Sequence, residues 1–252
     1  MPRPAGVTIK SPRELDLMRE AGRVASLTKI VLKNAIEPGI TSGELDALAE
    51  REIRSLGAIP SFKGLYDFPA TICFSFNEEI VHGIPSKRQL VDGDIVSVDL
   101  GAVVGGFHSD TAFTVGVGEI DDESQRLIEA TEESLRKAIE QTIAGQRIGD
   151  VSAAVQRYAE GLGYGVVRQY VGHGIGRALH EDPQVPNYGT PGRGTLLRPG
   201  MIIAIEPMLN IGTWDTRVMD DGWTVVTADG KRSAHFEDTV AVTESGPEVL
   251  TA

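Results

Sequence analysis

The sequence of 252 residues has one cysteine, no long apolar run and no excess of positive charge. A lone cysteine, Cys73, cannot form an internal disulfide, which is typical of a reducing cytoplasm. The longest apolar stretch, Met201 to Ile205, is far shorter than the roughly 20 residues that cross a bilayer, and no apolar signal region opens the chain. With 24 Lys and Arg against 36 Asp and Glu, the net charge of -12 disfavours sequence-independent nucleic-acid binding and attachment to anionic membranes. We therefore expect a cytoplasmic protein with no membrane contact and no direct nucleic-acid recognition.

Hydrophobic periodicity predicts an α+β protein. Ser11, with Glu14 three residues later, has the spacing of a capping box, and it starts the first helical pattern. The helices are expected at residues 12–35, 41–56, 121–144 and 151–162. Strands are expected at residues 71–76, 94–103 and 107–117, and the last ninety residues look mainly extended.

An internal repeat indicates a duplicated half-fold. Gly39, Gly43, Arg51, Leu56 and Gly57 recur as Gly145, Gly149, Arg157, Leu162 and Gly163. Downstream, LVDGDIVSVD resembles LRPGMIIAIE at nearly the same offset, which aligns Asp99 with Glu206. We predict a single catalytic domain over residues 1–252, with half-repeats of about 11–118 and 119–245. A site between the halves could take a carboxylate from each.

Four acids occupy apolar, strand-like surroundings. A hairpin that turns at Val104-Gly105, or over slightly more glycine, would place Asp99 opposite Asp110. A buried pair of like charges is costly unless one is protonated or a cation joins them. In the alternative, the register shifts by one and both acids face water. Glu206 ends the run MIIAI, and Glu237 lies in SAHFEDTVAVT, so the first arrangement is favoured.

Histidines complete a candidate metal site. His173 lies between glycines in YVGHGIG, so its neighbours leave its ring accessible; His180 follows, and His82 lies in VHGIP. His173 and the four acids form a thiolate-free set that suits manganese, iron, cobalt or zinc as a catalytic ion. Five ligands are more than one open metal site takes, so two metals roughly 3.5–4 Å apart are expected. A water bridging them would lose a proton and attack a carbonyl.

From about Ser11 to Val242, the chain closely resembles the type I methionine aminopeptidases. The likeness lies in the order of the five residues and in the motifs HGIP, DLGAVVGGFHSDTAFT, GHGIGRALHEDPQVPN, GMIIAIEPM and DGWTVVTADGKRSAHFEDT. The resemblance implies a pita-bread fold. It also implies removal of the initiator methionine from nascent proteins whose second residue is small.

The same resemblance implies a role for each site residue. Asp99 would bind one of two divalent metal ions, Asp110 and Glu237 would bridge them, and His173 and Glu206 would bind the other. Glu206 would also shuttle a proton. His82 would contact the amine side of the substrate or the leaving amide. His180 would hydrogen-bond the scissile carbonyl.

The resemblance further implies an apolar pocket for the methionine side chain. Its candidate residues are Phe68, Cys73, Leu179 and Trp223, with Leu65 as a further candidate. Two positions depart from the family pattern: Leu179 replaces an aromatic, and His235 replaces a glutamine. The first change should widen or soften the pocket wall.

Two other functions compete with this interpretation. One is a pita-bread peptidase that cleaves Xaa-Pro bonds; such enzymes usually carry an N-terminal domain and further histidines. The other is a metal-free peptide-binding module, but such modules lose ligands and all five are present here. The expected partners are nascent polypeptide N-termini and, through them, the ribosome, with the enzyme acting as a monomer.

Overall fold

The computed structural model describes residues 6–252, which form four α-helices. The helices are α1 (Pro12–Ala35), α2 (Ser42–Ser55), α3 (Asp122–Glu140) and α4 (Ile148–Gly161). The predicted capping box opens α1, because the Glu14 carboxylate accepts a hydrogen bond from the Ser11 backbone N–H at 3.0 Å. All four predicted helices are confirmed. The third ends at Glu140, earlier than predicted, and the fourth begins one turn earlier, where the Asp150 carboxylate accepts a hydrogen bond from the Arg147 backbone N–H at 2.8 Å.

A large antiparallel sheet forms the centre of the described chain. Its order is β10-β9-β11-β16-β7-β4-β2, with β17 paired to β16. Its strands are β2 (Ile72–Phe76), β4 (Ile95–Leu100), β7 (Thr111–Gly116), β9 (Gly172–Gly174), β10 (Glu181–Val185), β11 (Ile202–Ile205), β16 (Glu237–Thr243) and β17 (Gly246–Val249).

Short strands form three smaller sheets around it. These strands are β1 (Ile59–Pro60), β3 (Glu79–Val81), β5 (Ala102–Val104), β6 (Phe107–His108), β8 (Gly165–Val166), β12 (Met208–Asn210), β13 (Thr216–Val218), β14 (Val225–Thr227) and β15 (Ser233–His235). A single 3-10 turn, η1 (Leu65–Asp67), precedes β2.

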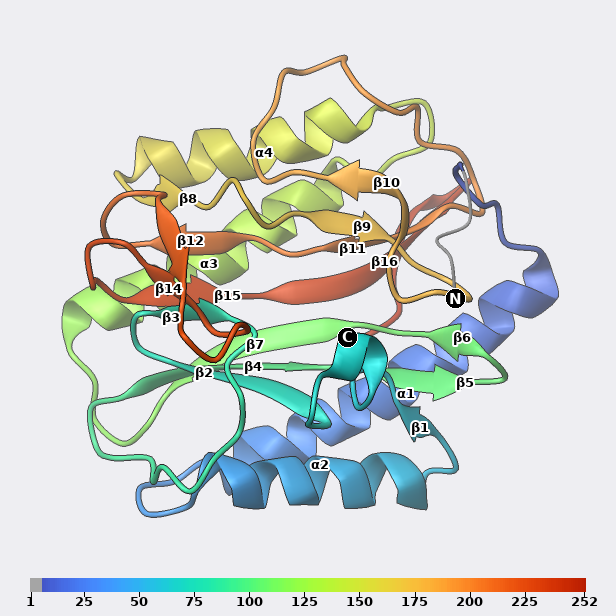
Figure 1. Cartoon of the computed structure of the whole chain (residues 1–252). Coiled ribbons are helices and arrows are strands. Elements are labelled where there is room, and N and C mark those ends of the chain that lie inside the picture. Colours follow the sequence, from blue (N-terminus) through green and yellow to red (C-terminus); the bar gives the residue numbers. More distant parts are fainter. Residues whose placement is uncertain (1–5) are drawn as a thin grey trace.

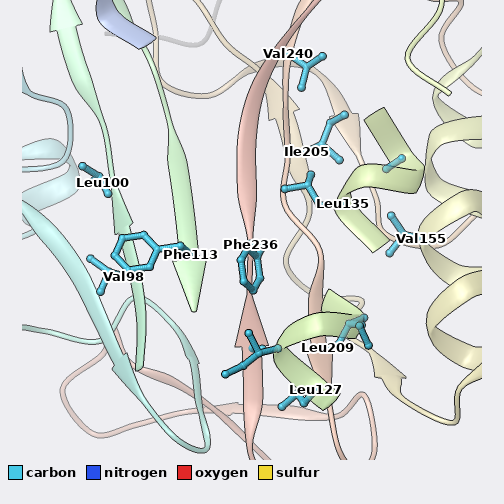
Figure 2. Close-up of a cluster of buried hydrophobic side chains, with 14 of the residues drawn as sticks. Val98, Leu100, Phe113, Leu127, Leu135, Val155, Ile205, Leu209, Phe236 and Val240 are labelled. Atoms are coloured by element: carbon cyan, nitrogen blue, oxygen red, sulfur yellow. The ribbon is translucent and has the colours of Figure 1, made fainter. Parts of the chain in front are cut away.

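The helices of each half lie mainly against strands of the same half, and α3 also contacts β7 of the other half. In Figure 1, α2 lies below the strands and α4 above them, whereas α1 and α3 run behind the sheet. α1 contacts β7 and α2 contacts β2, whereas α3 contacts β11 and β16 and α4 contacts β10. Figure 2 shows Phe113, Phe236 and Leu135 among the apolar side chains of the resulting core. The α+β class is confirmed, and the exact division into half-repeats stays a prediction.

Two predicted strands are interrupted, and the turn that joins them lies one residue later than expected. The segment 94–103 breaks at Gly101, where a Cβ atom would lie 2.4 Å from the carbonyl oxygen of Ser109. The partner segment breaks between β6 and β7, and Val104 pairs with Phe107 across a turn at Gly105-Gly106. Asp99 therefore lies opposite Ala112, not opposite Asp110 as predicted.

Candidate metal centre

One row of paired residues crosses the middle of the sheet. Cys73 on β2 pairs with Asp99 on β4, Asp99 pairs with Ala112 on β7, and Ala112 pairs with Glu237 on β16. Directly paired residues of antiparallel strands point to the same face, which we call the site face. The small side chain of Ala112 thus leaves space between the carboxylates of Asp99 and Glu237.

A second row approaches the same place from the other half. His173 on β9 pairs with Ala204 on β11, and Ala204 pairs with Thr239 on β16. Thr239 lies two residues after Glu237, so this row also points to the site face. Glu206 directly follows β11, two residues after Ala204.

Asp110 reaches the site from the end of its strand. It lies two residues before Ala112 and is therefore diagonal to Asp99 on the same face. The register shift that would have turned both acids to water does not occur. Asp110 is buried, with 4% of its surface exposed.

The glycines beside His173 have a packing role that the sequence did not indicate. A Cβ atom at Gly172 would lie 2.4 Å from the carbonyl oxygen of Ala204. A Cβ atom at Gly174 would lie 2.1 Å from that of Asp182. Only glycine therefore allows β9 to fit between β10 and β11 and to deliver His173 to the site.

The imidazole of His173 presents Nε2 to the acids. Its Nδ1 lies 3.0 Å from the carbonyl oxygen of Gly174, and because a carbonyl only accepts, Nδ1 carries the proton. Nε2 lies 3.7 Å from Asp110 Oδ2 and 3.6 Å from Glu206 Oε1. Candidate ligand atoms of Asp110, His173 and Glu237 all lie within 4.8 Å of one another. In this tautomer the Nε2 lone pair, which is the ring's metal-binding position, points toward the acids.

Burial of the acids disfavours their ionised forms and so raises their pKa values. Burial raises the pKa of Asp99 to about 7. Burial and the Asp99 charge raise the pKa of Glu206 to about 8. The pKa values of Asp110 and Glu237 are also raised well above the usual range, first by burial and then by the neighbouring acids.

Several acid oxygens have no partner within the described chain. Asp99 Oδ1, Asp110 Oδ1 and Glu237 Oε1 are buried without a hydrogen bond there. Unpaired buried carboxylate oxygens are costly unless a cation binds them. With one imidazole and no thiolate ligand, the five-residue cluster of Asp99, Asp110, His173, Glu206 and Glu237 fits divalent cations that prefer oxygen and nitrogen.

A cavity of about 80 Å³ opens beside the cluster. All five pocket residues proposed from the sequence line it, namely Leu65, Phe68, Cys73, Leu179 and Trp223. Phe68 and Trp223 contact edge to face, with ring centroids 5.1 Å apart. Burial raises the pKa of the Cys73 thiol, so Cys73 acts as a small apolar wall residue and not as a nucleophile.

The structure adds Phe62 and Tyr66 to the cavity wall. Tyr66 and Asp67 have left-handed backbone torsions, with φ of 50° and 68°. Tyr66 was not predicted because this conformation is rare for tyrosine, although Gly64, with φ of 85°, and Asp67 mark a turn here. The Tyr66 ring stacks on His180, with centroids 6.1 Å apart.

Both remaining predicted histidines line the cavity. His180 contacts the ring of His173 edge to face at 4.5 Å. The loop before it is held by Glu181, which accepts hydrogen bonds from the Ala178 backbone N–H at 3.2 Å and from Lys10 Nζ at 2.8 Å. His82 contacts Tyr170 edge to face, and burial lowers the pKa of His82.

His235 is buried near the site. Burial and the nearby His82 lower the pKa of His235 to about 3, so its ring is neutral at physiological pH. Its Nε2 has no hydrogen-bond partner in the described chain. His235 does not line the cavity.

The comparisons with known proteins agree with this site. The model of metallopeptidase family M24 matches residues 16–244. Methionine aminopeptidase 1 of Bacillus subtilis is 54% identical over 245 residues, covering 97% of this chain and 99% of the relative. The crystal structure of a methionine aminopeptidase from Thermotoga maritima has a TM-score of 0.96 at 47% identity, covering 98% of this chain and 99% of that one.

A prolidase from Pyrococcus furiosus is more distant. Its TM-score is 0.80 at 25% identity, and the match covers 97% of this chain but 65% of the prolidase. Both neighbours share the pita-bread architecture, so the predicted fold is confirmed. Among residues 6–252, no helix is long and apolar enough to span a membrane. The chain belongs to metallopeptidase family M24, where it groups with the methionine aminopeptidases.

Proposed function

We propose that the chain removes the N-terminal methionine from newly made proteins whose second residue is small. The observation that carries the proposal is the apolar cavity of Phe68, Leu179 and Trp223 directly beside the five-residue cluster. An unbranched thioether suits such a cavity because it adapts to irregular apolar walls. The name shared by relatives at 54% and 47% identity supports the preference for methionine.

The metal centre of this proposal holds two divalent ions, chosen from manganese, iron, cobalt and zinc. Asp99 would hold one ion, His173 and Glu206 would hold the other, and Asp110 and Glu237 would be shared between the two. The unpaired buried oxygens of Asp99, Asp110 and Glu237 support this assignment. When bound, the ions supply a Lewis acid and an ionised water as the nucleophile.

The surrounding side chains orient the substrate and move protons. Glu206 lines the cavity, where its carboxylate would take a proton and return it to the leaving amine. His180, fixed between the rings of Tyr66 and His173, donates a hydrogen bond to the scissile carbonyl. His82, kept neutral by burial, contacts the amine side of the substrate. The apolar walls exclude water from the methionine subsite.

The partners follow from this substrate. Nascent polypeptide N-termini emerge from the ribosome, so we propose that the enzyme acts in the cytoplasm close to ribosomes. It needs no second copy for the chemistry, because this chain supplies all five cluster residues. A monomer is therefore the proposed working form.

Metal removal and a peptide panel test the proposal. Cleavage of Met-Ala-Ser should disappear after chelation and return with Mn²⁺ or Co²⁺. Met-Xaa peptides with a small second residue should be cleaved, and Xaa-Pro peptides without methionine should not. A rate that resists chelation, or cleavage of Xaa-Pro peptides alone, would contradict the proposal.

A further inference from the structure

The helix-facing side of the sheet, opposite the site face, carries a further acid that is largely but not fully buried. Asp238 on β16 pairs with Thr111 on β7, directly behind Glu237 and Asp110. Only 18% of the Asp238 side chain is exposed. Within residues 6–252, the backbone ladder between β7 and β16 consists of two pairs, Glu237 with Ala112 and Asp238 with Thr111. The two halves of the sheet therefore meet along a short seam.

Lys29 of α1 crosses this seam with three polar contacts. Its Nζ donates to the carbonyl oxygen of Thr251 at 2.7 Å and to Thr111 Oγ1 at 3.2 Å. It also lies 3.5 Å from Asp238 Oδ1. An ammonium group has three protons, so these acceptors satisfy it.

Thr251, in the segment after β17, also contacts Asp238. Its hydroxyl is fully buried, donates to Asp238 Oδ1 at 2.8 Å and accepts from the Thr239 backbone N–H at 3.1 Å. Gly22 lets this segment pack on α1, because a Cβ atom there would lie 2.1 Å from the carbonyl oxygen of Leu250.

Two threonines connect this group to the acids of the metal site. The Thr111 hydroxyl donates to the carbonyl oxygen of Glu237 at 2.8 Å. The Thr239 hydroxyl donates to the carbonyl oxygen of Asp110 at 2.8 Å and accepts from the Asp110 N–H at 2.9 Å. The backbones of both proposed bridging acids are therefore fixed by side chains and not by a long ladder.

We propose that Lys29 and Thr251 are positioning residues of the metal centre. They hold Thr111, Asp238 and Thr239 in place across the seam, and so set the separation of the Asp110 and Glu237 carboxylates. Partners that orient metal ligands typically contribute about 10–100-fold to metal affinity. The inference rests on the proposed metal centre but concerns residues that touch neither metal nor substrate.

Thr251→Val tests the role of the hydroxyl while keeping the shape of the side chain. Protein loaded with Mn²⁺ is dialysed against a graded chelator series, and the retained metal is measured. We expect Thr251→Val to lose Mn²⁺ at a free-metal concentration about tenfold higher than wild type, the lower end of the usual range. Thr251→Ser, which keeps the hydroxyl, should restore retention.

Thr131→Val is the matched control. Thr131 is fully buried in α3, and its hydroxyl donates to the carbonyl oxygen of Leu127 at 2.7 Å, within the same helix and not to a residue of the seam. The control should lower the melting temperature without changing Mn²⁺ retention. Equal metal loss in Thr131→Val and Thr251→Val would mean that general destabilisation causes the loss, and it would overturn the inference.

Lys29→Met provides a second route if Thr251→Val does not fold. It removes all three contacts and should weaken Mn²⁺ retention at least as much. Wild-type retention in either folded variant would overturn the inference while leaving the proposed function intact. A wild-type protein that retains no Mn²⁺ would instead contradict the metal centre itself.

Discussion

The acids on the two faces of the β7–β16 seam differ in whether their carboxylate oxygens have partners. On the helix-facing side, Asp238 has Lys29, Thr111 and Thr251 as partners. On the site face, Asp110 and Glu237 each keep a buried oxygen without a partner in the described chain. Neighbouring positions of one strand therefore differ sharply in how the protein satisfies their charge.

This difference separates an acid that serves the fold from acids that serve a ligand. Burial raises the pKa of Asp238 above its usual range, and Lys29 and the hydroxyls of Thr251 and Thr111 oppose part of that rise. On the site face the neighbouring acids add to burial and raise the pKa values of Asp110 and Glu237 further. A cluster of this kind stores unfavourable electrostatic energy that bound cations would relieve.

The largest expected effect is the loss of activity in Asp110→Asn on the site face, compared with Asp238→Asn on the helix-facing side. Asp110→Asn should lower kcat/KM for Met-Ala-Ser by more than about 100-fold, because it removes a proposed ligand and not merely the partner of one. Its fold should persist, since the buried like charges are reduced. Asp238→Asn should retain turnover within about tenfold at saturating Mn²⁺ but lower the melting temperature, because Lys29 loses its counter-ion.

Kinetics, circular dichroism and thermal melts on both variants measure the contrast. Wild-type turnover in Asp110→Asn would mean that the ligand assignment is wrong. A larger loss of kcat in Asp238→Asn than in Asp110→Asn would reverse the comparison between the two faces.

The identity of the five cluster residues could be predicted from the sequence, but their arrangement in space could not. Asp99, Asp110, His173, Glu206 and Glu237 stand out because each interrupts or ends an apolar or glycine-rich segment, where an unpaired charge is costly. The sequence could not supply the register, because the partner of Asp99 depends on which two residues form the turn, here Gly105 and Gly106 and not Val104 and Gly105.

The helix-facing contacts could not be predicted at all. Lys29 lies 209 positions from Asp238 and 222 from Thr251, and nothing in local periodicity links such distant residues. Tyr66 was missed for a different reason, since its left-handed torsion contradicts the preference of its own residue type. Helices and strand positions were predictable because they rest on local patterns.

A smaller effect is expected in the pH dependence of stability. Asp99 and Glu206 have folded-state pKa values of about 7 and about 8, well above the ordinary values of carboxyl groups. The folded protein without metal therefore holds protons that the unfolded chain releases, and this stability is lost as the pH rises from about 4 to 8. Loaded with Mn²⁺, the same acids are held ionised and the loss should be much reduced.

Thermal melts of chelated and Mn²⁺-loaded protein from pH 5 to pH 9 test this. Each 1 kcal/mol shifts the melting temperature of a domain of this size by roughly 2–4 °C. Asp99→Asn removes one of the acids and should flatten the curve of the chelated protein. Identical slopes for the chelated wild type and Asp99→Asn would show that the site-face acids do not carry the effect.

The smallest effect is expected for His235→Gln. His235 lies close to the site face but is neutral, because its pKa of about 3 is far below its usual 6.5. It therefore adds no charge to the cluster, and the pH–rate profile between pH 6 and pH 9 should not change in the variant. Glutamine can donate as well as accept, so it should satisfy its surroundings at least as well as the unpartnered Nε2 does, with an unchanged or slightly higher melting temperature. A shifted profile would place His235 among the titrating groups of the reaction, and the contrast between the faces would then involve more than the carboxylates.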